Sequence, residues 1–218
     1  MSHNSSSPDF LHHHFHDVDQ QYQTSKFGMW AFILTEVLTF GGLFVAYTVY
    51  RSWYPEMFYD AHLLLDVNKG MLNTIVLISS SLTMALAIWA IQKKNKKLSL
   101  WMLVITWILA LGFLGIKYLE YSHKFEVGQL PGIFYSYMGP EVVNIDNPHI
   151  FFGIYFIMTG LHGLHVAIGM GLIAWLIYLT KKDKLHSDYY TPMETVGIFW
   201  HLVDLIWIYL FPLFYLIG

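Results

Sequence analysis

Long apolar stretches alternate with short polar segments along most of the chain. A helix needs about 20 consecutive apolar residues to cross a bilayer. Five stretches reach that length, at about residues 27–50, 71–91, 98–118, 150–179 and 196–217. Because lipid offers no partner to backbone donors and acceptors, each of these segments is expected to be an α-helix. The pattern therefore predicts an all-α integral membrane protein with a bundle of five transmembrane helices.

The polar segments between these stretches predict how the chain is organised. Residues 1–25 are polar and rich in histidine, which is typical of a solvated or surface-docked segment, and a metal site in "HHHFH" (12–16) is the alternative. Residues 26–218 are expected to form a single transmembrane domain. The very short "KKNKK" (93–97) predicts a tight antiparallel hairpin, and the long connection 122–148 predicts an ordered surface loop.

Composition supports this class and removes several kinds of chemistry. Hydrophobic residues make up 56% of the chain and charged residues 12%, as expected of a membrane protein. The absence of cysteine excludes disulfides, iron–sulfur clusters and covalent haem attachment through thioethers. The net charge of −3 is not that of a nucleic-acid-binding protein, so no nucleic acid is expected as a partner.

The distribution of basic residues predicts the orientation of the chain. Eight of the twelve lysines and arginines fall on the side of the membrane that holds the N-terminus, including the clusters at 93–97 and 181–184. By the positive-inside rule, we expect the N-terminus in the cytoplasm and the C-terminus outside.

Five ionisable residues fall near the centres of predicted spans, namely Glu36, His162, His165, His201 and Asp204. Such groups are costly in hydrocarbon, so each is a candidate for function. The members of each pair, His162 with His165 and His201 with Asp204, are three residues apart and share a helix face. They suit hydrogen bonds between helices, with Glu36 as one partner. The alternative is a proton relay, because histidine and buried glutamate can change charge near neutral pH.

A metal site is the weakest interpretation of these histidines. Two histidines three residues apart on one helix cannot bind opposite faces of a haem, and a copper or zinc site needs further converging ligands. The span is instead typical of a packing surface. Small residues recur along it in a pattern that lets another helix approach closely. They are Gly160, Gly163, Ala167 and Gly171.

Several strings together resemble a known family. They are "TEVLTFGGLFVAY" (35–47), "LNTIVLISSSLT" (72–83), "LGFLGIKYLEY" (111–121), "GLHGLHVAIG" (160–169) and "ETVGIFWHLVDLIWIYLF" (194–211). In this order they are similar to subunit III of the haem–copper oxidases, the cytochrome c oxidase and quinol oxidase group. The resemblance covers residues 27–218 and is to the short, five-helix bacterial type.

The resemblance implies a non-catalytic accessory subunit of a respiratory terminal oxidase, which reduces oxygen to water and translocates protons. It implies direct binding to subunit I, with subunit II and other respiratory-complex subunits nearby, in the bacterial cytoplasmic membrane. Haem and copper are expected in the partner subunits and none in this chain, and phospholipid is a further expected ligand. The resemblance also implies that the subunit supports proton uptake, and Glu36 matches the family's carbodiimide-reactive carboxylate, as either a proton site or a structural anchor. Lys117 departs from the family, which often has glutamine there.

Two other functions are consistent with the polar residues alone. The first is a free-standing proton or ion transporter that uses Glu36 and the histidines near the bilayer centre, although the five spans show no internal inverted repeat. The second is a membrane cytochrome, which the spacing of His162 and His165 on one helix disfavours.

Overall fold

The computed structural model describes residues 15, 17–137, 147–187 and 189–217. These residues form long helices with short connections, and an isolated bridge joins His186 to Tyr189. The elements are α1 (Val18–Trp53), α2 (Pro55–His62), α3 (Val67–Gln92), α4 (Lys96–Val127), the 3₁₀ helix η1 (Gly132–Phe134), α5 (His149–Lys181) and α6 (Thr191–Tyr215). In this described part, five helices are long and apolar enough to cross a membrane, namely α1, α3, α4, α5 and α6. The prediction of an all-α integral membrane protein with five spans is confirmed.

The helices extend beyond the apolar stretches that predicted them. α1 begins at Val18, inside the polar segment, because the Asp17 side chain accepts a hydrogen bond from the Gln20 backbone N–H at 2.6 Å and caps the helix. α4 has 32 residues and is therefore about 48 Å long, more than the hydrocarbon thickness. The division at residue 25 stays a prediction, and the histidines of 12–16 lie outside the described residues.

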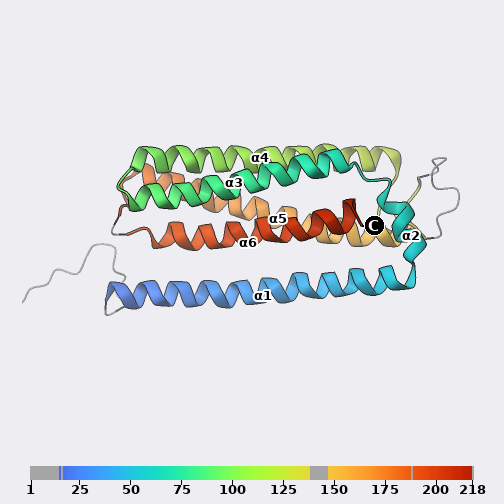
Figure 1. Cartoon of the computed structure of the whole chain (residues 1–218), viewed down its shortest axis with the longest axis horizontal. Helices are drawn as coiled ribbons and strands as arrows, with labels where there is room; N and C mark the ends of the chain where they lie inside the picture. The colour runs from blue at the N-terminus through green and yellow to red at the C-terminus, as the bar shows by residue number, and fades with distance from the viewer. Residues whose placement is uncertain (1–14, 16, 138–146, 188, 218) are drawn as a thin grey trace, which may run out of the picture.

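Helices α3 to α6 form a four-helix bundle, and α1 lies along one edge of it, as Figure 1 shows. α1 contacts mainly α6. In its most apolar stretch only 6% of the residues are buried within the chain, compared with 50% in α6. α3 and α4 form the expected hairpin, where the Asn95 side chain accepts a hydrogen bond from the Leu98 N–H at 3.1 Å. Most of α1 is thus left to face lipid or another chain.

The glycines that allow close helix packing are not those of the predicted stripe. A Cβ at Gly169 would lie 2.7 Å from the Trp200 ring, and one at Gly197 would lie 2.6 Å from Ile88. By contrast, a Cβ at Gly163 or Gly171 would have no described atom within 4 Å, and one at Gly160 would meet only the Tyr121 hydroxyl, at 3.9 Å.

Within the described residues of this chain, no helix therefore packs closely on Gly160, Gly163 or Gly171. Residues spaced three or four apart follow one side of the helix, and on α5 this side is partly an open surface, where Ala167 and Gly171 are exposed. Contact with another subunit at this surface stays a prediction.

Candidate polar sites at membrane depth

Glu36 of α1 and His165 of α5 meet in the interior of the membrane domain. Their atoms Oε2 and Nε2 are 2.9 Å apart, and their side chains are 14% and 12% exposed. Phe40 presents its edge to the imidazole with ring centroids 5.5 Å apart, and Phe199 lies on another side at 6.4 Å. The structure thus brings together two of the five predicted polar residues in a largely apolar enclosure.

The second nitrogen of His165 fixes how protons are placed in this contact. Nδ1 lies 2.8 Å from the Leu161 backbone oxygen, which can only accept, so Nδ1 carries a hydrogen. A neutral imidazole then has a bare Nε2 facing Glu36. Glu36 Oε2 has no hydrogen-bond partner unless a proton lies between it and Nε2. The contact therefore requires one proton, carried either by the carboxyl group or by the imidazole.

His162 has a different environment from His165, although the two share a helix. It is fully buried, and neither of its ring nitrogens has a hydrogen-bond partner among the described residues. Phe113 meets it edge-on with ring centroids 5.5 Å apart, and Trp207 lies on its other side at 5.3 Å. A polar contact between helices is therefore found for His165 and not, among the described residues, for His162, because aromatic rings of α4 and α6 enclose His162.

His201 and Asp204 of α6 are also separated from the Glu36 contact. Ser81 Oγ lies 2.7 Å from His201 Nδ1 and so links α3 to α6. Asp204 is 3% exposed, and its carboxyl oxygens make no hydrogen bond among the described residues. A buried carboxyl group without a partner is destabilising.

These contacts do not fit a metal or haem site. His165 is occupied by Glu36 and by the Leu161 carbonyl, His162 is enclosed by rings, and Nδ1 of His201 is bonded to Ser81. Across the described ranges, no group of three histidine, aspartate or glutamate side chains lies close enough to share a metal ion. A proton role for the five residues and a role in holding helices together both stay predictions.

A second polar cluster lies in the C-terminal half of α4. Lys117 Nζ donates to Glu120 Oε2 at 2.9 Å, to the Tyr215 hydroxyl at 2.7 Å and to the Tyr155 hydroxyl at 3.2 Å. Tyr155 and Tyr215 both donate to Glu120 Oε1, at 2.8 Å and 2.6 Å respectively. Lys117 also lies 4.6 Å from the centre of the Trp207 ring. The cluster joins α4, α5 and α6 through a buried and fully hydrogen-bonded ion pair.

Sequence reasoning missed this cluster because the third span was expected to end at residue 118. That boundary placed Lys117 and Glu120 at the membrane surface, whereas α4 continues to Val127 and the two side chains are 7% and 3% exposed. The sequence did contain a signal for an ion pair, because the two opposite charges are three residues apart in a helix with a continuous apolar face.

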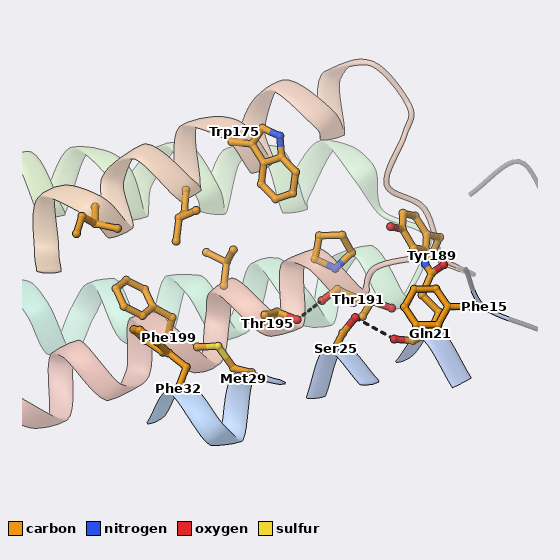
Figure 2. A pocket seen from close by; sticks show the side chains of 14 residues that line it. Phe15, Gln21, Ser25, Met29, Phe32, Trp175, Tyr189, Thr191, Thr195 and Phe199 are labelled. Atoms are coloured by element: carbon orange, nitrogen blue, oxygen red, sulfur yellow. Dashed lines mark hydrogen bonds between the residues drawn. The ribbon is translucent and has the colours of Figure 1, made fainter. Parts of the chain in front are cut away.

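A cavity of about 550 Å³ opens between α1, α5 and α6. Figure 2 shows Met29 and Phe32 of α1 beside Phe199 of α6, with Trp175 of α5 on the opposite wall. Polar groups such as Ser25 and Thr195 lie toward one end, where Figure 2 marks their hydrogen bonds to backbone carbonyls of their own helices. The cavity is thus apolar over most of its length, and its Phe199 wall adjoins His165.

Comparison with known proteins gives consistent matches. A family model described as "Cytochrome c oxidase subunit III" matches residues 5–218. The chain is 30% identical to the "Heme-copper oxidase subunit I+III" of Aeropyrum pernix over 87% of its length, and it spans only 22% of that longer protein. It is 26% identical to the "Probable quinol oxidase subunit 3" of Staphylococcus haemolyticus, over 100% of this chain and 98% of that one. The "Cytochrome bo(3) ubiquinol oxidase subunit 3" of Buchnera aphidicola is 28% identical, over 92% and 90%.

Proposed function

The chain belongs to the cytochrome c oxidase subunit III family, and from this premise we propose that it stabilises subunit I of a haem–copper terminal oxidase and supports proton uptake there. The observation that carries this proposal is the family match over residues 5–218. The complex that we propose reduces oxygen to water and translocates protons.

The proposed partners are subunit I by direct contact, and subunit II with the other chains of the respiratory complex. One relative is named as a fusion of subunits I and III, which supports proximity of the two in this complex. The proposed location is the bacterial cytoplasmic membrane. The lysine-rich α3–α4 and α5–α6 connections would face the cytoplasm, by the positive-inside rule.

We assign the redox chemistry to the partner chains. The three histidines at membrane depth in this chain have separate neighbours, and they do not converge on a common point. Haem and copper therefore need ligands that other subunits supply. In this proposal, the contribution of this chain is to packing and protons.

The proton role rests on the contact between Glu36 and His165. This contact requires one proton, and it is enclosed by Phe40 and Phe199. A buried group that holds one proton can buffer the local supply when the catalytic subunit takes protons up. The neighbouring apolar cavity suits an acyl chain of a membrane phospholipid, which would keep water away from the pair.

The experiment that tests this function is purification through a tag on this chain, in a mild detergent. We expect oxidase subunits I and II to co-purify, with haem absorbance and oxygen uptake in the complex. After the subunits are dissociated, we expect the absorbance to follow subunit I and not this chain. Haem retained by the separated chain would contradict the proposal. Proton or ion flux through liposomes that contain only this chain would support a free-standing transporter instead.

A further inference from the structure

His201 differs from its neighbours His162 and Asp204 because it is only partly buried. Its Nδ1 is bonded to Ser81, at 2.7 Å. Its Nε2 has no hydrogen-bond partner among the described residues. This atom is nevertheless not one of the fully buried polar atoms without a partner, so it is accessible from outside the chain. His162 and Asp204, by contrast, are 0% and 3% exposed. One nitrogen of His201 is therefore presented outward near the middle of a transmembrane helix.

The surroundings of His201 form a seam along the outside of α3 and α6. Ser81 and His201 are both partly exposed, and they lie side by side because their side chains are bonded. Ile78 of α3 and Leu205 of α6 are each 51% exposed, and Ala85 of α3 is exposed as well. These five residues are called the α3–α6 seam below. Its sides are apolar, and its centre is a polar nitrogen.

A polar nitrogen cannot be satisfied by lipid tails. The hydrocarbon core contains neither donors nor acceptors, so an unpaired polar group there is destabilising, and such groups on transmembrane helices face other protein or water-filled space. Hydrogen bonds between helices are the usual way to satisfy them. The polar centre of the seam thus calls for a polar complement from outside this chain.

We propose that a transmembrane helix of a neighbouring oxidase subunit packs on the α3–α6 seam and hydrogen-bonds to Nε2 of His201. This inference rests on the proposed function, which supplies the neighbouring subunit. The matching side chain carries a hydroxyl or a carboxamide, because these groups donate and accept and so suit either tautomer of His201. Ala85 leaves room for a close helix approach beside that bond.

Cysteine labelling in the purified complex tests this contact, and the chain contains no native cysteine to interfere. The seam variants are Leu205→Cys and Ile78→Cys. The control is Ile108→Cys on the outside of α4, where the native side chain is 56% exposed. With a lipid-soluble maleimide, we expect both seam cysteines to react severalfold more slowly than the control. Equal rates would show that lipid covers the seam, and would overturn the proposal.

Substitution of His201 tests the hydrogen bond itself. Hydrogen bonds between membrane helices change association by about threefold to fifteenfold, so we expect His201→Leu to weaken retention of the neighbouring subunit in detergent by that factor. We expect His201→Gln, whose carboxamide can make the bond, to restore most of the retention. Equal retention in both variants and in the unsubstituted complex would overturn the bond.

The two proposals fail in different ways. If no oxidase subunit co-purifies with the unsubstituted chain, both are overturned. If the subunits co-purify and the seam cysteines react as fast as Ile108→Cys, the proposed function stands and the docking surface does not.

Discussion

Glu36 on α1 and His165 on α5 are 2.9 Å apart, in a contact that both links two helices and requires a proton. α1 otherwise contacts mainly α6, so the pair ties it to α5 at membrane depth. These two roles can be separated by substitution, because a carboxamide can donate a hydrogen bond to Nε2 but cannot release the proton.

Glu36→Gln is expected to keep the link between the helices and to lose the proton exchange, whereas Glu36→Ala loses both. In an assembled oxidase, we expect initial oxygen reduction close to normal in both variants, and a faster loss of activity during turnover in both. An oxygen electrode measures the initial rate and its decay. If Glu36→Gln decays as slowly as the unsubstituted complex, the contact is structural alone. An immediate, complete loss of activity would also contradict the prediction.

His162→Phe and His165→Phe form a matched pair on one helix. His162 makes no described hydrogen bond and lies between aromatic rings, so a phenyl ring should be tolerated, within about 1 kcal/mol of stability. In His165→Phe the carboxyl group of Glu36 loses its polar partner, which should cost about 1–3 kcal/mol. Thermal unfolding of the complex compares them. A loss of haem absorbance in His162→Phe would contradict this reading of His162.

The spans could be predicted from the sequence because a membrane imposes one simple requirement, a long apolar segment. The helix ends could not be predicted as well. Asp17 starts α1 well before the apolar stretch, and α4 carries Lys117 and Glu120 in its buried face before it ends at Val127. Helix caps and buried ion pairs depend on local and tertiary contacts, to which a hydropathy pattern is insensitive.

The site was predictable in its residue types and depth but not in its partners. A spacing of three residues places His162 and His165 on one broad face, yet a difference of about 60° around the helix axis directs them to different neighbours. His165 meets Glu36, while His162 meets Phe113. The pairing depends on where α1 lies, and no window of the sequence contains that information.

The ion pair of Lys117 and Glu120 should show strong coupling. Glu120→Ala leaves a buried ammonium group without its counter-charge, and should cost about 3–5 kcal/mol of stability. The double variant Lys117→Met with Glu120→Leu removes both charges, and should cost less than Glu120→Ala alone. Thermal unfolding of the unsubstituted complex, of Lys117→Met and Glu120→Leu alone, and of the double variant measures the coupling. Additive losses would contradict the buried network.

Gly169→Ala and Gly163→Ala separate the observed packing contact from the predicted one. A Cβ at residue 169 would lie 2.7 Å from the Trp200 ring, so the ring or the helices must shift, at a cost of about 1–3 kcal/mol. A Cβ at residue 163 has no described atom within 4 Å, and the change should be neutral or slightly stabilising. Unfolding of both variants in the complex checks this. A large cost for Gly163→Ala would show that another subunit lies on that surface.

Asp66, which caps α3, should make stability depend on acid pH. Its side chain accepts hydrogen bonds from the N–H groups of Asn68 and Lys69, at 3.0 and 3.3 Å. Burial alone would raise the pKa of Asp66, but these bonds and the Lys69 charge outweigh it and hold the pKa below its ordinary value of 3.8. A lowered pKa stabilises the folded state above that ordinary value, and the contribution is lost as the pH falls through the folded-state pKa.

The control for this dependence is Asp66→Asn, which still caps the helix but does not titrate near pH 4. Between about pH 6 and pH 3, we expect the unfolding temperature of the unsubstituted complex to fall further than that of the Asn variant. The difference should be small, because the Asp66 side chain is 41% exposed and solvent screens its charge. Asp66→Ala should lose about 1 kcal/mol already at pH 6, since it removes the cap. Parallel curves for the Asp and Asn forms would contradict the lowered pKa.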